Sequence, residues 1–369
     1  MFGLKWLFEV RLCRDDAKSE RGSTSIHGRK HRKGTKKKLQ TSVGALTIRN
    51  RHILYGQAGG FSISSFMQQQ MCYMGQEKVF EQASECFIRL TGVDVNAKQI
   101  ERLCHHYGNL LEEKQWQSIA SGENASKKND RQSYYAMLDG GMILTREEKW
   151  KEMKLARIFD RRSRTSISKE RGYIGSSTYV AHLGGCKDFL QKIEYHLDTK
   201  GEIIFIADGA PWIWKWVEAM YPESTQILDF YHAKQHLCQW AELAIKNPHE
   251  RIGWIDTQTE WILNNQIDKV IERIKKMPAY YPKTKQCKKA LIEYYTTHRD
   301  RMQYKTYREH GRMIGSGPIE AAHRHVVQQR MKLSGQRWTI KGAQQVANLR
   351  VAFKNEQWDQ VIALTKMAA

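Results

Sequence analysis

At 369 residues, the chain is long enough for two or three domains with a proper core, and its 41% hydrophobic and 10% aromatic content is typical of a globular protein. A formal net charge of +21 favours a polyanionic partner, either nucleic acid or an acidic membrane surface. No apolar run of about eighteen residues exists, so a membrane-spanning helix is excluded, and residues 2–10 lack the features of a signal peptide. Seven cysteines without a CxxC pair indicate reduced thiols in a cytosol. Nucleic acid is therefore the favoured partner, in a cytoplasmic protein associated with the nucleoid.

The N-terminal part, residues 1–70, is predicted to be a basic arm. No acidic residue occurs between Arg21 and Gln76, and Arg29–Lys38 is almost wholly basic. Such a run cannot pack a core but can bind DNA phosphates by releasing counterions; a solvated tail is the alternative. A small hairpin is expected within Val43–Tyr55. The DNA-binding candidates of the arm are Arg29, Lys30, Arg32, Lys33, Lys36, Lys37 and Lys38.

Residues 71–125 show the apolar spacing of two short helices. The first ends at Thr91-Gly92, and the second is capped by Asn96 and expected to end at Gly108. The pair resembles a helix-turn-helix that presents Lys98 and Arg102 to a DNA groove. Two packed helices without a DNA role are the alternative. The polar stretch that follows is interpreted as a linker to the main domain.

Residues 130–237 predict a mixed, five-stranded α/β sheet flanked by helices. The unbroken apolar run Ile203–Ala207 is typical of a strand buried on both faces, and it ends at Asp208 and a glycine. In the predicted strand order, the strand Tyr134–Asp139 lies beside Ile203–Ala207, so that Asp139 faces Asp208. Ligands of α/β sheets bind at the carboxyl ends of such strands.

The remaining chain is predicted to be helical. Residues 238–312 carry successive apolar stripes broken by prolines, which indicates an all-helical insertion. Residues 313–369 return to the core, where Ser316 and Pro318 introduce a helix that begins near Glu320. The outer face of this helix is expected to be basic through Arg324, Arg330 and Lys332.

Three of these acids suit a metal site. Two carboxylates on neighbouring strands repel each other unless a cation lies between them, and Mg²⁺ (or Mn²⁺) prefers such oxygen ligands. With Glu320 as a third ligand, Asp139 and Asp208 can hold two ions about 4 Å apart for in-line attack on a phosphodiester. Solvated surface carboxylates or helix caps are the alternative interpretation.

Asp229 and His232 form a second cluster, expected to support the metal site or to orient a phosphate. A buried Asp–His hydrogen bond is the alternative. His232, His236 and Cys238 also make zinc conceivable, but their spacing is not a zinc-finger pattern.

Five blocks of the sequence resemble one family. They are LDGGMILTREEKWKEMKLARIF, IADGAPWIW, ILDFYHAKQHL, the long block from His298 to Trp338, and GAQQVANLR. In order and spacing they are similar to the bacterial insertion-sequence transposases of the Kra class, DDE enzymes related to the Mutator-like superfamily. The resemblance covers most of the chain from about Tyr134 onward.

This resemblance implies an RNase H-like fold and a DDE triad of Asp139, Asp208 and Glu320. Asp229 and His232 match the (Cys or Asp)-x-x-His motif of the superfamily. Arg337-Trp338 match a block for which DNA contact is one interpretation and packing of Trp338 the other. Relatives often carry paired cysteines near the N-terminus, and this chain has none there.

The sequence thus predicts a metal-dependent transposase that acts on double-stranded DNA as a homodimer or larger assembly. An RNase H-like nuclease or resolvase needs the same acids but no strand transfer. An inactive, domesticated DNA-binding protein would use only the basic arm and the helices. A protein of the membrane surface is the least favoured class, because no basic amphipathic helix with a Trp/Leu face stands out.

Overall fold

The computed structural model describes residues 36–41, 44–49, 61, 63–123, 133–167, 172–197 and 201–367. The chain divides into a first unit, residues 1–40 with 44–55, and a second unit that holds almost all the rest. The first unit carries a hairpin of β1 (Lys36–Thr41) and β2 (Gly44–Arg49). The hairpin expected within Val43–Tyr55 therefore overlaps β2 only, because its partner strand comes earlier. Arg29, Lys30, Arg32 and Lys33 lie outside the described residues.

The second unit begins with a three-helix module of α1 (Ser65–Glu77), α2 (Phe80–Thr91) and α3 (Ala97–Ala120). The predicted cap is confirmed, since the Asn96 side chain accepts a hydrogen bond from Gln99 N at 2.9 Å. The predicted end of the helix at Gly108 is wrong. A Cβ at this position would collide with the backbone of Gln345, so Gly108 marks a close contact between helices rather than a helix end.

The five-stranded mixed sheet is confirmed. Its strand order is β7-β4-β3-β8-β9, in which β3 pairs antiparallel with β4 and parallel with β8. The strands are β3 (Tyr134–Thr145), β4 (Lys149–Asp160), β7 (Thr178–Leu183), β8 (Ile203–Ala207) and β9 (Thr225–Leu228). All five residues of β8 are buried, as expected for a central strand. A short hairpin of β5 (Arg164–Ser166) and β6 (Gly172–Ile174) follows β4.

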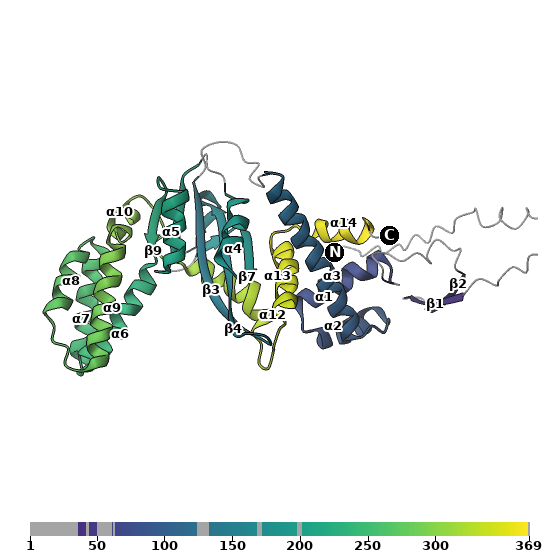
Figure 1. The fold of residues 1–369 in the computed structure, drawn as a ribbon, viewed down its shortest axis with the longest axis horizontal. Helices are drawn as coiled ribbons and strands as arrows, with labels where there is room; N and C mark the ends of the chain where they lie inside the picture. Colours follow the sequence, from purple (N-terminus) through teal and green to yellow (C-terminus); the bar gives the residue numbers. More distant parts are fainter. Residues whose placement is uncertain are drawn as a thin grey trace, which may run out of the picture. The chain divides into compact units, whose positions relative to one another are not determined.

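Helices cover both faces of the sheet (Figure 1). On one face, α4 (Cys186–Glu194) and α5 (Pro211–Met220) meet, and Trp216 Nε1 donates to Glu194 Oε1 at 2.7 Å. On the other face, Arg157 of β4 donates to the carbonyl of Pro318 in α11 (Gly317–Ala322). The core therefore lies in two layers around the sheet.

The region predicted as an all-helical insertion, residues 238–312, is helical, but its first helix begins earlier, at Phe230. It packs as a group in which α6 contacts α7 and α9, and α8 contacts both α7 and α9. These helices lie together beyond the β9 edge in Figure 1. The elements are α6 (Phe230–Ala244), α7 (Pro248–Leu263), α8 (Ile267–Lys276), α9 (Pro282–His298) and α10 (Tyr304–Glu309), with a single 3₁₀ turn at Arg299–Arg301.

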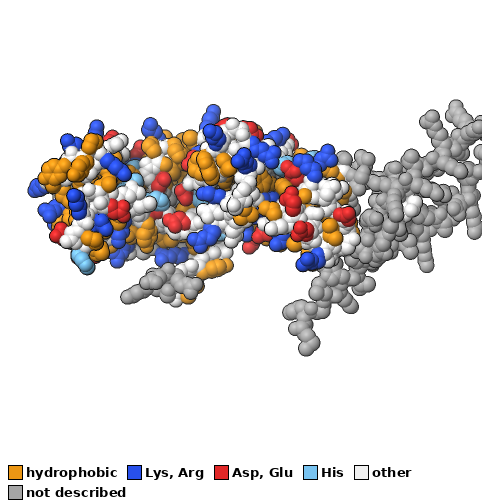
Figure 2. Space-filling view, turned by 90° about the horizontal axis from the view of Figure 1, so that it is seen from below, with side chains coloured by type: hydrophobic (Ala, Val, Ile, Leu, Met, Phe, Trp, Pro, Cys, Tyr) orange, Lys and Arg blue, Asp and Glu red, His pale blue; other side chains and the backbone are white. Residues whose placement is uncertain are grey.

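The C-terminal part returns to the sheet and to the three-helix module. After α11 come a π-helical stretch (His323–Gln328), α12 (Gln329–Met331), α13 (Ile340–Lys354) and α14 (Trp358–Met367). Helix α13 packs against both β7 and α3, which joins the module to the core. Blue Lys and Arg side chains are spread over the described surface in Figure 2. None of the helices described here combines the length and apolarity that a bilayer crossing requires.

Candidate metal centre

Asp139 and Asp208 lie at the same level on two neighbouring strands. Asp208 directly follows the end of β8, whereas Asp139 lies within β3, so the predicted end of that strand at Asp139 is wrong. The parallel register of β3 and β8 closes on Leu138 opposite Ala207, and each aspartate is the next residue. Strands in this register lie about 4.8 Å apart, so the two carboxylates are neighbours. Burial raises the pKa of Asp208, and the negative charge of Asp139 raises it further. The expected pairing of these two acids is therefore found.

The turn after β8 is held by the insertion. Asp208 Oδ1 accepts from Ala210 N at 3.0 Å, and its carbonyl accepts from Trp214 Nε1 at 2.7 Å. A Cβ at Gly209 would collide with the ring of Tyr294 from α9, so only glycine allows that approach. The insertion thus packs directly against the strand end that carries Asp208.

Asp229 is a fully buried carboxylate with its hydrogen-bonding capacity filled. Its Oδ1 accepts from the backbone of Tyr231 at 2.7 Å and of His232 at 3.4 Å. Its Oδ2 accepts from His232 Nδ1 at 2.9 Å and from both the backbone N–H and the hydroxyl of Ser316. Burial alone would raise the pKa of Asp229, but these hydrogen bonds outweigh it and lower the pKa. Asp229 therefore joins the start of α6 to the segment that leads into α11.

His232 is oriented by this carboxylate. The hydrogen bond from Nδ1 to Asp229 raises the pKa of His232 to about 9 against the opposing effect of burial. The negative charges of Asp208 and Asp139 act in the same direction, which places the imidazole near both of these acids. A cationic ring beside an acidic site can bind a phosphate oxygen.

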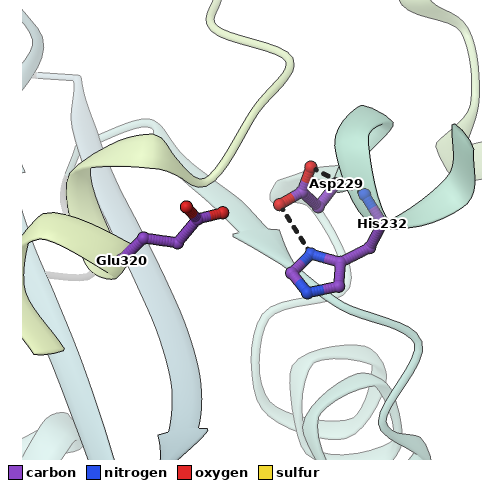
Figure 3. A group of neighbouring side chains, drawn as sticks. All are labelled: Asp229, His232 and Glu320. Atoms are coloured by element: carbon purple, nitrogen blue, oxygen red, sulfur yellow. Dashed lines mark hydrogen bonds and ion pairs between the residues drawn. The ribbon is translucent and has the colours of Figure 1, made fainter. Parts of the chain in front are cut away.

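Glu320 extends from α11 toward the Asp229–His232 pair (Figure 3). One ligand atom each from Asp229, His232 and Glu320 lies within 4.8 Å of the others, so the three residues form a group able to hold a metal ion. Helix α11 is positioned by its packing on β3 and β4 and by the hydrogen bond from Phe230 N to the carbonyl of Ile314. Glu320 itself is exposed, which leaves its carboxylate open to a ligand.

His323 is a site residue that the sequence analysis missed. It follows Glu320 by three residues, is only 3% exposed, and places Nε2 3.7 Å from Asp139 Oδ2. Neither ring nitrogen forms a hydrogen bond to a described residue. The E-x-x-H spacing, which puts both side chains on one helix face, was the available signal. Glu320 lies close to His232, and His323 lies close to Asp139. This one helical segment therefore connects the Asp139–Asp208 pair to the Asp229–His232 pair.

The predicted DNA contacts divide into exposed and buried side chains. Arg330 is fully buried: its Nε donates to Gly75 O at 3.0 Å, and its guanidinium lies over the rings of Phe80 and Trp338. Trp338 is also buried and donates from Nε1 to Met331 O at 2.9 Å. The prediction that these two residues contact DNA is wrong, because both pack the three-helix module onto the core. The exposed candidates are Lys98, Arg102, Arg324, Lys332 and Arg337.

The donor set fits a hard divalent cation. Within the described ranges, no Lys or Arg forms a salt bridge with Asp139, Asp208 or Glu320. Carboxylate oxygens are the ligands that such cations prefer. The grouping suggested for zinc is not found among these residues: His236 packs against the ring of Tyr294, and Cys238 does not join the metal-binding group.

Comparison with known proteins adds no relative. A scan against models of protein families finds no match, and a search of curated proteins finds none either.

Proposed function

We propose that the chain is a metal-dependent DNA transposase with an RNase H-like core, in which Asp139, Asp208 and Glu320 are the catalytic acids. The observation that carries the proposal is the pairing of Asp139 on β3 with Asp208 after β8, next to His232, which lies in one group with Asp229 and Glu320. The net charge of +21 supports a nucleic-acid substrate. The resemblance to Kra-class transposases adds strand transfer to this chemistry.

The residues that would hold Mg²⁺ or Mn²⁺, as two ions, are the same three acids. When bound, the ions activate the attacking oxygen and stabilise the leaving oxygen of a phosphodiester. Asp229 contributes less as a ligand, because every lone pair that faces the site already accepts a hydrogen bond. Its role is to fix His232 and the start of α11, and hence Glu320.

The other side chains bind and position the DNA. His232, kept cationic by Asp229, is placed to bind a phosphate oxygen beside the acids. His323 packs against Asp139 and restricts that carboxylate to one orientation. The basic arm and the three-helix module would hold the DNA flanking the cleaved bond.

The proposed reaction has two steps in one site. Water first hydrolyses the phosphodiester at the end of the element, which leaves a free 3′-hydroxyl. That hydroxyl then attacks a phosphodiester of the target DNA, and the target strand's own 3′-oxygen leaves as a hydroxyl, so that the element end becomes joined to the target's 5′ side. Because an element has two ends, each complex needs two active sites, so a dimer or larger assembly is proposed.

The test is cleavage of a supercoiled plasmid that carries the ends of the element. Wild-type protein is expected to nick or cut the plasmid with Mg²⁺ or Mn²⁺ and to lose this activity in EDTA. Asp208→Asn should abolish cleavage and leave DNA binding intact, whereas Asp256→Asn, an exposed acid of α7, should cleave as wild type. Retained cleavage by Asp208→Asn contradicts the proposal.

A nuclease or resolvase would use the same acids. The two functions differ in their products, since only a transposase joins the cleaved 3′ end to a second DNA. A labelled, pre-cleaved end incubated with target plasmid should therefore yield a joined product. Hydrolysis without any joined product would identify a nuclease.

A further inference from the structure

The turn between α8 and α9, at the far end of the insertion, is strongly basic. Residues 273–289 contain seven Lys or Arg and no acid. Helix α8 buries Val270, Ile271 and Ile274, so its cations lie on the opposite, exposed face. This stretch, residues 273–289, is called the basic tip below.

Two cations of the basic tip have structural partners. Lys288 donates to the carbonyls of Lys275 and Met277, which fixes the turn onto α9, and Lys275 pairs with Glu272 at 3.0 Å. The others are exposed, and none forms a salt bridge to an acid in the part of the chain that the structure describes. They are Arg273, Lys276, Lys283, Lys285 and Lys289.

The basic tip also exposes two adjacent aromatic rings. Tyr280 is 78% exposed and Tyr281 is 65% exposed, although tyrosine rings usually gain stability from burial. Beside them, a shallow groove of about 730 Å³ is lined by three lysines, one acid (Glu293), two threonines and apolar side chains. In Figure 2, the end of the molecule that holds the insertion shows orange surface bordered by blue Lys and Arg. Cations with exposed aromatics suit a strand whose phosphates and bases are both accessible.

Helix α9 connects the basic tip to the candidate metal centre. The helix begins at Pro282, and Tyr294 packs against Gly209 beside Asp208. The twelve residue-to-residue steps from Pro282 to Tyr294 span about 18 Å of helix, which equals roughly five nucleotides of a DNA strand. DNA bound at the strand ends can therefore reach the basic tip.

We propose that the basic tip is a second DNA-binding surface, which holds the strand next to the cleaved bond. The five unpaired cations bind phosphates, and Tyr280 and Tyr281 stack on bases that are not paired. The basic tip would be a DNA-binding site in addition to the catalytic one. The proposal rests on the proposed function only for the identity of the bound strand, the one next to the cleaved bond.

The experiment measures DNA binding by the full chain in EDTA, so that no cleavage occurs. Fluorescence anisotropy is recorded with a labelled duplex and with a labelled single strand over a range of salt concentrations. The test variant is Lys283→Glu/Lys285→Glu/Lys289→Glu. The matched control, Lys187→Glu/Lys215→Glu/Lys366→Glu, changes the net charge equally at exposed positions outside the three-helix module. A Tyr280→Ala/Tyr281→Ala variant tests stacking.

The tip variant should weaken binding about tenfold near physiological salt and reduce the slope of log Kd against log salt by about two to three, one per lost phosphate contact. The control should change Kd less than twofold. The tyrosine variant should weaken single-strand binding about tenfold and duplex binding much less. Equal weakening by the tip and control variants, or no weakening by the tip variant, overturns the proposal. Metal-dependent cleavage by wild-type protein is scored separately, so failure here leaves the proposed function standing.

Discussion

Asp208 and Asp229 occupy equivalent places in the fold but opposite environments. Ala207 of β8 pairs with Leu228 of β9, and each aspartate is the next residue. Asp208 accepts one backbone hydrogen bond, and its pKa is raised. Asp229 accepts hydrogen bonds from several backbone and side-chain donors, and its pKa is lowered. The comparison shows what the number of hydrogen-bond donors decides. A carboxylate at a strand end can bind a ligand when the protein supplies few donors to it, and it stabilises the fold when the protein supplies many.

The largest expected difference is in cleavage. Asp208→Asn should reduce metal-dependent cleavage by about a thousandfold or more, since it removes a catalytic ligand. Its free energy of unfolding should stay equal to that of wild type or rise, because repulsion with Asp139 is relieved. Plasmid cleavage and urea denaturation measure the two effects. A marked loss of stability would show that Asp208, like Asp229, stabilises the fold, and would contradict this prediction.

The converse change is expected to act on stability. Asp229→Asn loses the charge and offers amide donors to groups that need an acceptor, so we expect it to lower the free energy of unfolding by about 2–3 kcal/mol. Urea denaturation beside the control Asp256→Asn measures this. An Asp229→Asn protein as stable as wild type, with unchanged cleavage, would show that the buried network does not position the site.

A smaller effect is expected from Ser316→Ala. This change removes one hydroxyl donor to Asp229 and should cost about 1.5 kcal/mol. Because Ser316 precedes Glu320 in the same segment, the metal concentration for half-maximal cleavage should rise several-fold while the rate at saturating metal changes little. A titration of cleavage against Mn²⁺ separates the two parameters. A lower saturating rate with unchanged metal dependence would contradict this role.

The smallest expected effect is on the pH dependence of stability, and it concerns an ion-paired carboxylate away from the site. Glu112 of α3 accepts from Lys192 Nζ at 2.8 Å, and Lys192 is only 1% exposed. Burial would raise the pKa of Glu112, but the Lys192 ammonium lowers it below 4.5. A lowered folded-state pKa means that the pair stabilises fully above about pH 4.5 and that this contribution disappears as the pH falls through the lowered value.

We therefore expect wild-type stability to fall more steeply below pH 4.5 than that of Glu112→Gln, with a difference of about 1 kcal/mol at neutral pH. Thermal unfolding from pH 3 to 7 measures it. If stability falls in parallel with pH for the two proteins, the ion pair does not stabilise the packing of α3 against α4.

The pairing of Asp139 and Asp208 was predictable because its signal is local. An apolar run that ends in Asp-Gly identifies β8 and Asp208, and the order of strands places Asp139 beside it. Glu320 is different, since its approach to His232 depends on how an intervening helical insertion folds. The helix entry at Ser316 and Pro318 and the resemblance to a family both indicated Glu320, but no local pattern predicts its approach to His232.

The buried arginine escaped prediction for a physical reason. Helical periodicity treats every arginine as a surface residue, but Arg330 is buried between two aromatic rings with a backbone carbonyl as its acceptor. Gly108 was misread in the same way, because a glycine that permits helix contact looks like one that ends a helix. Both errors concern contacts between segments that are distant in sequence.

The central claim is that Asp139, Asp208 and Glu320 share bound divalent metal. The most direct measurement replaces Mg²⁺ with Fe²⁺ and generates hydroxyl radicals at the bound metal with ascorbate and peroxide. Mass spectrometry then locates the cuts in the polypeptide. We predict cuts close to all three acids, suppressed by excess Mg²⁺ and absent in Asp208→Asn. Cuts confined to other segments, or to only one of the three, would contradict the account.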